Sequence, residues 1–277
     1  MYNLHNHTTC SDGKLTPEEL IKMAYEKGLS GIAITDHDNI DAASIAKEFL
    51  KNKNWDFTFV SGVEISCKLS DDDFIKRVKE KTGKPFPEIH VLGLGVDENN
   101  PLLKEELENL LIQRKNRGLL MIEKLRDAGY EIFRDFNIED EPFIGRVKIA
   151  HELVRIGEAE TVSEAFDKFL NRTSPYYVKS KVLTVKRAIE IIHFAGGIAS
   201  LAHPGEIGNE EVLKRVLKEN FDALECYHPS NDKAMTKRLL METERLGIKV
   251  TGGSDFHGIE EQAYEDFTKY GVNELWL

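Results

Sequence analysis

The chain has 277 residues and a formal net charge of −11, from 37 basic and 48 acidic residues. A protein that holds a long nucleic-acid duplex along its phosphates is usually basic, so we do not expect this class of partner. Hydrophobic residues make up 41% of the chain and charged residues 31%, which is the balance of a folded protein and not of a disordered one.

In the first hundred residues, apolar runs of strand length alternate with helical patterns, and this alternation favours an α/β architecture. One helix has a well-marked start, because Thr16 and Glu19 form a capping box and Pro17 takes the first helical position. A polar stretch over 71–88 contains two prolines and is expected to be a loop or a short excursion of the chain. The expected strands cover residues 2–5, 31–35, 57–65 and 90–94, and the expected helices cover 17–27 and 41–50.

The pattern changes at Pro101, and only helical spacing continues from there to about Arg172. Leucines at positions 103, 107, 110 and 111 recur at the spacing of one helix face. We therefore expect a helical insertion domain over 101–172, between two parts of an α/β domain over 1–100 and 173–277. In the second part, helices are expected over 185–194, 210–218 and 233–246, and strands over 197–201, 223–227 and 248–251.

Histidines and acidic residues gather near the ends of the expected strands. His5 and His7 are two apart, which points both rings to one side of an extended segment, and Asp255 and His257 repeat this spacing after the last strand. In barrel-like α/β folds the loops after the strands converge on one face, so residues far apart in sequence would meet there. The candidate metal ligands are His5, His7, Asp12, His37, Glu64, His90, His203, Asp255 and His257.

These nine groups are too many for one ion and suit two or three ions that share a bridging carboxylate. Imidazole and carboxylate without thiolate favour Mn²⁺, Fe²⁺ or Zn²⁺, with Mg²⁺ as an option at the most oxygen-rich position. Ions about 3.5–4 Å apart would lower the pKa of a shared water and neutralise charge on a phosphoryl group. The chain contains neither a G-x-S-x-G elbow nor a P-loop.

A single His-x-His or Asp-x-His pair is a weak signal, since about half of such pairs are ordinary structural residues. The arrival of several such clusters at strand ends favours metal binding for the group. His151 and His193 lie within helical patterns and are expected to be structural. His228 follows a strand beside Pro229 and Ser230 and is a weaker candidate to line the site.

Five motifs hold most of these candidate ligands. They are His-Asn-His-Thr-Thr-Cys-Ser-Asp-Gly over 5–13, Ile-Thr-Asp-His-Asp over 34–38, Gly-Val-Glu-Ile over 62–65, Ala-His-Pro-Gly over 202–205 and Gly-Gly-Ser-Asp-Phe-His-Gly over 252–258. Through these motifs the chain resembles the polymerase and histidinol phosphatase (PHP) superfamily along nearly its whole length, and within it the stand-alone bacterial group with a helical insertion. The resemblance implies a distorted (β/α)₇ barrel with a small helical insertion domain and a trinuclear metal centre.

The resemblance also implies a division of the ligands among three ions. One ion would be bound by His5, His7, Glu64 and Asp255, a second by Glu64, His90 and His203, and a third by Asp12, His37 and His257. A metal-bound hydroxide held by Glu64, Asp255 and His203 would then attack phosphorus in line.

In the stand-alone bacterial group that this chain resembles, basic residues of the insertion bind a second phosphate of the substrate. Gly145-Arg146-Val147-Lys148-Ile149-Ala150 matches a family segment that has proline and histidine where this chain has Val147 and Lys148. Arg146 is the best candidate phosphate clamp, because its planar fork suits phosphate, and Lys148 can bind phosphate as a point charge. Arg114 and Arg117 are further candidates, three apart on one helix face. Asn3 also departs from the family, which usually has Asp there.

The resemblance implies hydrolysis of small phosphorylated nucleotides, such as removal of the 3′-phosphate from nucleoside 3′,5′-bisphosphates. Stepwise 5′→3′ hydrolysis of short RNA or other oligonucleotides is the nearest alternative. A histidinol-phosphate phosphatase is a third, although that substrate carries one phosphate and leaves the arginines of the insertion without a role. A non-catalytic metal-binding module is a fourth.

The remaining features concern the compartment. The three cysteines, Cys10, Cys67 and Cys226, lie far apart and are expected to be reduced thiols. The sequence lacks a signal-peptide pattern and any run of about 18 apolar residues, so we expect a cytoplasmic protein without a membrane partner. Oligomeric state and protein partners leave no readable signal.

Overall fold

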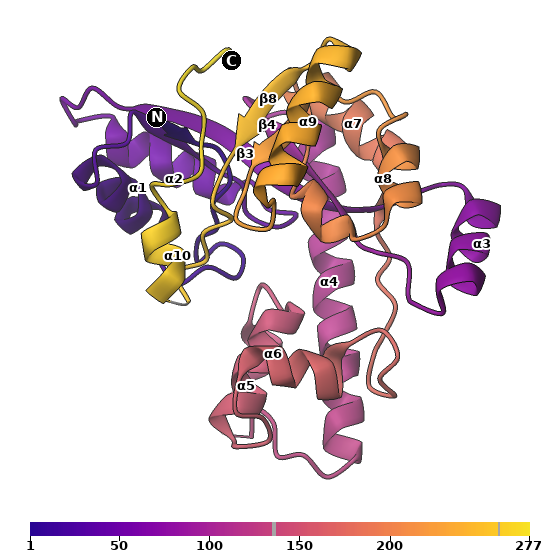
Figure 1. Ribbon diagram of the computed structural model, residues 1–277. Coiled ribbons are helices and arrows are strands. Elements are labelled where there is room, and N and C mark those ends of the chain that lie inside the picture. The colour runs from indigo at the N-terminus through magenta and orange to yellow at the C-terminus, as the bar shows by residue number, and fades with distance from the viewer. Residues whose placement is uncertain (135–136, 260) are drawn as a thin grey trace. The chain divides into compact units, whose positions relative to one another are not determined.

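A computed structural model describes residues 1–134, 137–259 and 261–277 of the chain (Figure 1). The chain divides into two compact units. We call Met1–Leu107 together with Val182–Leu277 the barrel unit, and Glu108–Lys181 the insert unit. The long helix α4 (Pro101–Asp127) begins in the first unit and ends in the second.

Seven strands of the barrel unit form one continuous sheet that almost closes on itself. The amide of Leu4 donates to the carbonyl of Gly252 at 3.0 Å, which joins the segment after the first strand to the last strand. The predicted distorted (β/α)₇ barrel is therefore confirmed. In order around the sheet, the strands are β1 (Tyr2–Asn3), β2 (Gly31–Ile34), β3 (Thr58–Lys68), β4 (Ile89–Leu94), β6 (Ile198–Leu201), β7 (Ala223–Tyr227) and β8 (Lys249–Gly252).

The distortion of the barrel lies at β4. This strand runs antiparallel to both of its neighbours, β3 and β6, whereas the other neighbouring pairs along the sheet are parallel. A strand that runs backwards begins at the edge where its neighbours end. His90, the second residue of β4, therefore pairs with Ser66 late in β3, close to Glu64.

Helices cover the outside of this sheet, and several have the predicted bounds. Thr16 caps α1 (Pro17–Glu26) by accepting from the Glu19 amide, and Glu19 accepts from the Thr16 amide, so the predicted capping box is present. The predicted bounds also hold for α2 (Asp41–Leu50), α7 (Val185–Phe194) and α9 (Lys233–Leu246), and α8 (Glu210–Val216) ends two residues early. The short α10 (Glu261–Asp266) and β5 (Leu183–Thr184), which pairs with β3, were not predicted.

The expectation of a loop over 71–88 was wrong, because the segment contains helix α3 (Asp72–Thr82). Asp71 caps this helix by accepting from the Phe74 amide, and Gly83 ends it with a φ of 64°. Phe74 and Val78 are buried on one face, and the Phe74 ring meets Phe86 edge-on. Phe74 and Val78, one turn apart, thus form the buried apolar face of a helix that is otherwise mostly polar.

Side chains from strands around the sheet pack into a single apolar cluster, as in a filled barrel. Its buried members are Leu4, Ala33, Val60, Leu92, Leu94, Ala202 and Val272. A second cluster lies between the sheet and the helices α1 and α2, and it includes Phe256 and Phe267, both fully buried. Phe256 stands between two candidate ligands, so its burial anchors the loop that carries them.

Among the described residues of the insert unit, the regular elements are all helices, and the unit has a core of its own. After α4 it contains the short 3₁₀ helix Ile138–Asp140, then α5 (Arg146–Arg155), α6 (Val162–Ala165) and a π-helical turn over Phe166–Leu170. Leu125, Ile149 and Leu153 are among its fully buried side chains. Glu152 supports an unusual backbone here, because it accepts from the amide of Phe133 at 2.8 Å, whose φ is 53°. Across both units, none of the described helices has the length and hydropathy needed to cross a bilayer.

Candidate metal centre

All nine candidate ligands lie in the barrel unit, and the fold brings them into one cluster. His5 and His7 follow β1, and Asn6 between them turns the opposite way, with its amide nitrogen donating to the Ala33 carbonyl at 2.9 Å. His37 follows β2, and its backbone pairs with that of Glu64 in an isolated parallel β-bridge. Glu64 was expected at the end of its strand but lies within β3, which continues to Lys68.

The first group of donors consists of His5, His7, Glu64 and Asp255, whose candidate ligand atoms all lie within 4.8 Å of one another. Nε2 of His7 is 3.2 Å from Oε2 of Glu64 and 3.0 Å from Oδ1 of Asp255. Nε2 of His5 is 3.4 Å and 3.2 Å from the same two oxygens. Two imidazoles and two carboxylates thus face a common point.

A second group gathers at the other side of the Glu64 carboxylate. Oε1 of Glu64 lies 2.8 Å from Nδ1 of His90 and 3.0 Å from Nε2 of His203, and those two nitrogens are 3.1 Å apart. Nδ1 of His37 lies 3.0 Å from Oε2. The two oxygens of Glu64 therefore face different sets of imidazoles, which is the arrangement of a bridging carboxylate.

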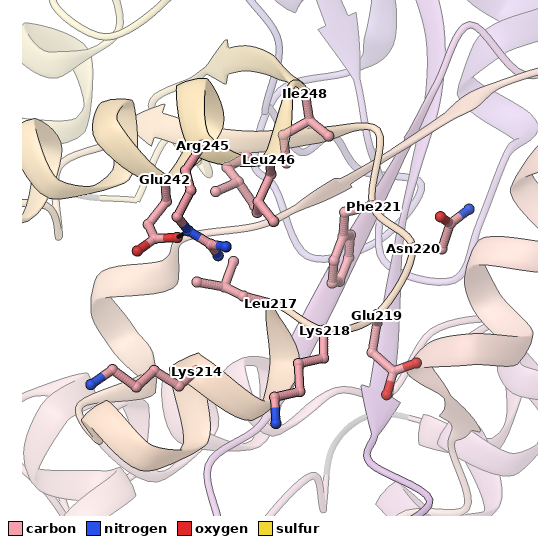
Figure 2. A pocket seen from close by; sticks show the side chains of 11 residues that line it. Lys214, Leu217, Lys218, Glu219, Asn220, Phe221, Glu242, Arg245, Leu246 and Ile248 are labelled. Atoms are coloured by element: carbon pink, nitrogen blue, oxygen red, sulfur yellow. Dashed lines mark hydrogen bonds and ion pairs between the residues drawn. The ribbon is translucent and has the colours of Figure 1, made fainter.

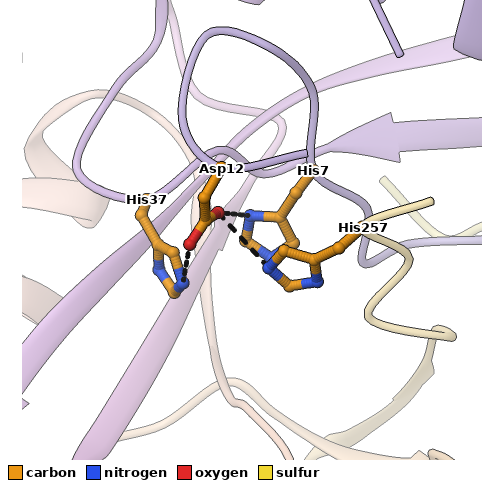
Figure 3. A group of neighbouring side chains, drawn as sticks. All are labelled: His7, Asp12, His37 and His257. Carbon is orange, nitrogen blue, oxygen red and sulfur yellow. Dashed lines mark ion pairs between the residues drawn. The ribbon is translucent and has the colours of Figure 1, made fainter. Parts of the chain in front are cut away.

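The third group surrounds Asp12 (Figure 3). Its Oδ1 lies 3.3 Å from Nε2 of His257 and 3.9 Å from Nδ1 of His7, and its Oδ2 lies 3.9 Å from Nε2 of His37. His7 and His37 each belong to two groups, one through each ring nitrogen. The three groups are therefore contiguous and form one extended array of donors.

The chemistry of these donors fits divalent cations. Within the described part of the chain, six buried side-chain atoms of the candidate ligands make no hydrogen bond, although leaving a buried polar atom without one is costly. All are imidazole nitrogens or carboxylate oxygens, the ligands that Mn²⁺, Fe²⁺ and Zn²⁺ accept. They are Nε2 of His5 and His7, Nδ1 of His37, Oδ1 of Asp12 and Asp255, and Oε2 of Glu64.

The cluster also keeps its carboxylates ionised. Burial alone would raise the pKa of Glu64, but the imidazoles of His37, His90 and His5 hold the pKa well below its usual range. Asp255 behaves in the same way, because burial opposes ionisation while His5 and His257 lower its pKa well below the usual value. Both side chains are anionic at neutral pH and can attract cations.

Backbone strain accompanies two of the candidate ligands. His203 has a φ of 28° and Asp255 a φ of 52°, in the left-handed region that side chains other than glycine seldom adopt. Such strain persists only where the surroundings hold it, and it is concentrated at functional sites. Pro204 and the 3₁₀ helix Pro204–Ile207 follow His203, and fully buried Phe256 follows Asp255.

Two buried carboxylates that support the cluster were not identified from the sequence. Asp36 accepts from the amide of Thr8 at 2.7 Å and from its hydroxyl at 2.6 Å, which fixes the loop after His7. Glu225 contacts Nδ1 of His5 and the amide of His203, at 3.0 Å and 2.7 Å. The sequence contained a clue to both residues. Asp36 adjoins the candidate ligand His37, and Glu225 is the one charged residue of the apolar strand 223–227.

The ring of His228 lies beside the cluster and is 3% exposed. Its Nε2 is 3.9 Å from Oδ2 of Asp255, and its Nδ1 accepts from the amide of Ser230 at 3.1 Å. A backbone amide can only donate, so Nδ1 carries a lone pair and the proton of the neutral ring is assigned to Nε2. His228 therefore presents a hydrogen-bond donor toward the cluster.

Asn3, at the position where the family usually has Asp, links the first and last motifs of the barrel unit. Its amide nitrogen donates to the hydroxyl of Ser254 and to the carbonyl of Phe267, at 2.8 Å and 2.9 Å. Its side-chain oxygen accepts from the amide of Ser254 at 3.2 Å. An ionised aspartate could not donate a hydrogen bond to the Phe267 carbonyl. The need for this donor explains why asparagine is suited to this position.

The other predicted residues do not belong to the donor groups. His193 pairs with Asp222 at 2.6 Å on the outside of the barrel unit, and His151 lies on α5 in the insert unit.

Arg117 is 8% exposed, donates from Nε to the Val178 carbonyl at 2.8 Å and lies over the Tyr177 ring. Arg114 and Arg146 lie over the rings of Phe143 and Phe166, and Lys148 pairs with Glu141. These four cations belong to the insert unit.

A cavity of about 740 Å³ lies at the amino ends of β7 and β8 (Figure 2). The candidate ligand Asp255, in contrast, follows the carboxyl end of β8. Leu217, Phe221 and Leu246 line its apolar part, and Lys218 and Arg245 lie among its charged residues. Arg245 is already paired with Glu242 at 2.7 Å. The cavity shares no residue with the donor cluster, so it plays no part in the chemistry of that site.

Comparison with known proteins agrees with this geometry. A family model described as the PHP domain matches residues 3–230. The 5′-3′ exoribonuclease Rnm of Salmonella typhimurium is 32% identical over 267 residues, which cover 93% of this chain and 85% of that protein. The 3′,5′-nucleoside bisphosphate phosphatase of Chromobacterium violaceum is 28% identical over 263 residues, which cover 92% of this chain and 86% of that protein.

One solved structure is similar over almost the full length. It is that of a candidate metal-dependent phosphoesterase from Bifidobacterium adolescentis, with a TM-score of 0.79 and 28% sequence identity. The similarity covers 98% of this chain and 96% of the other. The agreement therefore includes the barrel strands that carry the donor cluster.

Proposed function

The chain belongs to the PHP family of metal-dependent phosphoesterases, and from this premise we propose that it hydrolyses the phosphate esters of small nucleotides. The observation that carries the proposal is the donor cluster, in which buried nitrogen and oxygen atoms without hydrogen bonds face one another around Glu64. Removal of the 3′-phosphate from a nucleoside 3′,5′-bisphosphate is the reaction we favour.

The cluster would hold two or three divalent ions, of Mn²⁺, Fe²⁺ or Zn²⁺, with Mg²⁺ as an option. When bound, such ions supply an activated water and neutralise charge on the phosphoryl group. We assign His5, His7 and Asp255 to one ion, His90 and His203 to a second, and Asp12, His37 and His257 to a third. Glu64 lies between the first two groups, because its two oxygens face separate sets of imidazoles.

His228 would contribute a hydrogen bond instead of a metal ligand. Its Nδ1 is occupied by the Ser230 amide, so its Nε2–H is the group directed at the cluster. A donor at this point suits a phosphoryl oxygen of the substrate, where negative charge accumulates as the leaving group departs. Glu64 and Asp255, held anionic, balance the charge of the cations.

A second phosphate would be bound by residues of the insert unit. Arg146 and Lys148 occupy the first turn of α5, which has no acidic residue there and no side-chain cap, since Gly145 is its N-cap. Amides at a helix start attract anions, and an arginine fork adds bidentate contacts. Arg114 is a further candidate. Arg117 is buried and donates to the Val178 carbonyl, and this contact gives it a structural role within the insert unit. A role in substrate binding stays a prediction for this residue.

A second candidate function is the stepwise hydrolysis of short RNA from its 5′ end. The identity of 32% to the Rnm exoribonuclease, against 28% to the bisphosphate phosphatase, favours it. Both reactions use the same donor cluster and differ in the leaving group. Hydrolysis of histidinol phosphate and a purely structural metal site lack a supporting observation of this kind.

The test is a substrate comparison with the purified, metal-loaded protein. Adenosine 3′,5′-bisphosphate, a 5′-phosphorylated short RNA and p-nitrophenyl phosphate would be assayed side by side for release of phosphate or mononucleotide. We expect the highest kcat/KM for the bisphosphate. A higher value for the RNA would establish the exonuclease instead, and a fully loaded protein that hydrolyses none of the three would refute both.

A further inference from the structure

Glu225 is a fully buried carboxylate in β7, and it contacts two candidate metal ligands. Its Oε1 and Oε2 lie 3.0 Å and 3.2 Å from Nδ1 of His5, and Oε2 also accepts from the backbone amide of His203 at 2.7 Å. Neither contact leaves the barrel unit. One side chain therefore connects a ligand of the first group with a ligand of the second.

Each contact has a separate consequence. A carboxylate accepts hydrogen bonds, so it places the proton of neutral His5 on Nδ1 and leaves the lone pair on Nε2. That Nε2 is the buried nitrogen without a hydrogen bond that faces Glu64 and Asp255. The same carboxylate also accepts from the backbone amide of His203, whose φ of 28° is strained, and this hydrogen bond helps to hold the strained backbone.

The fold presents Glu225 in this position. In the apolar strand β7 it lies between Leu224 and Cys226, both fully buried, and it pairs in register with Thr251 of β8. A register shift follows between Glu225 and Tyr227. Asn231 then donates to the Glu225 carbonyl at 3.0 Å, which ties the turn after the strand back to it.

We propose that Glu225 is a positioning residue of the metal centre, which selects the metal-binding tautomer of His5 and holds His203 in its strained conformation. The inference rests on the proposed function, because it assumes that both histidines bind cations. Carboxylates that accept from a ligating histidine typically contribute 10- to 100-fold to metal affinity. Glu225 itself has no need to touch an ion or the substrate.

The test compares Glu225→Gln with wild type by competition for Zn²⁺ and Mn²⁺ against a chelator. Glutamine has nearly the same shape, but it has one acceptor oxygen where glutamate has two, and its NH₂ group cannot accept from Nδ1 of His5 or from the amide of His203. If its NH₂ group faces Nδ1, it selects the other tautomer of His5. We expect at least one ion to bind about 10- to 100-fold more weakly. Wild-type affinity in this variant would overturn the proposal.

The matched control is Glu98→Gln. Glu98 is also a buried carboxylate of the barrel unit, but it pairs with Lys47 at 2.6 Å and lies outside the donor groups. This control should keep wild-type metal affinity. An equal loss of affinity in both variants, in step with an equal fall in Tm, would assign Glu225 an ordinary structural role and would also overturn the proposal.

A measurement on wild type makes the outcome independent of how the variant folds. In the Zn²⁺-loaded wild-type protein labelled with ¹⁵N and ¹³C, long-range ¹H–¹⁵N correlations report which ring nitrogen carries the proton, and sequential resonance assignment identifies the ring of His5. We expect the proton on Nδ1, and a proton on Nε2 would overturn the proposal. Since neither readout needs a substrate, a protein that binds ions but hydrolyses nothing would refute the proposed function alone.

Discussion

The imidazole rings of His7 and His257 lie stacked, with centroids 4.1 Å apart and planes at 16°, although they come from opposite ends of the chain. Nε2 of His257 also lies 3.3 Å from Oδ1 of Asp12. The third donor group therefore forms only when the loop after β8 packs on the segment after β1. The consequences of this long-range assembly can be measured.

Removal of metal should abolish hydrolysis and lower stability. Several of the donor atoms make no hydrogen bond with any described residue, and the donor groups assemble only in the folded chain, so bound ions stabilise the folded state and not the unfolded one. We expect chelation with EDTA to stop phosphate release and Mn²⁺ or Zn²⁺ to restore it. Calorimetry should show a lower Tm after chelation, by several degrees. Full activity in excess EDTA would contradict a metal-dependent reaction.

His5→Ala and Asp255→Ala should each reduce kcat by more than about 100-fold, chiefly through lost metal, because each removes a donor of the first group. Metal content by mass spectrometry, measured beside kcat, checks the cause. The exposed acidic residue Glu244 on α9 supplies the control, since Glu244→Ala should leave both quantities unchanged. A variant that keeps its full metal content and its full rate would remove that residue from the site.

Phe256→Ala should destabilise the protein by about 3–5 kcal/mol, the usual cost of removing a buried aromatic ring. Phe256 is fully buried against Phe267 and Tyr264, with ring centroids 4.9 Å and 5.0 Å away. Because it anchors the loop of Asp255 and His257, metal affinity should fall as well. Urea denaturation measures the first effect. Phe194, which is 69% exposed, is the comparison, and Phe194→Ala should change stability by less than about 0.5 kcal/mol.

Arg146→Ala should raise KM for a nucleoside 3′,5′-bisphosphate by about tenfold or more and leave hydrolysis of p-nitrophenyl phosphate unchanged, because an aryl phosphate has no second phosphate to bind. Steady-state kinetics on the two substrates separate these effects. Arg134, an exposed arginine of the same unit that pairs with Glu131, serves as the control. Equal losses on both substrates would exclude Arg146 from substrate recognition.

Metal binding should release protons at pH 7. Burial alone would lower the pKa of His257, but Asp12 and Asp255 raise it to about 10, and Glu64 and Glu206 raise the pKa of His203 to about 9 against the same effect of burial. Without metal both rings are protonated at pH 7, so a cation must displace those protons, and its affinity should rise with pH until about pH 9–10. Titration calorimetry in two buffers of different protonation enthalpy counts the protons. An affinity that is constant between pH 6 and 9 would contradict this account.

The sequence predicted correctly the helices that depend on interactions between residues near one another in the chain, and it missed elements that depend on contacts with distant residues. Local signals were sufficient for α1, whose capping box lies within four residues, and for α2, α7 and α9, whose bounds agree with the prediction. They failed for α3, where two buried side chains, Phe74 and Val78, outweigh a polar composition. They also missed β5, a two-residue strand that exists only through its pairing with β3.

The sequence by itself determined that His5 and His7, and likewise Asp255 and His257, can face one site, because a spacing of two residues places both side chains on the same side of an extended chain. Only the tertiary structure decided how the donors divide into groups, since the antiparallel course of β4 places His90 beside Glu64. The role of Glu225 also came from the fold. A lone glutamate in an apolar strand has no partner within its own segment, and closure of the barrel alone brings His5 and His203 to its two oxygens.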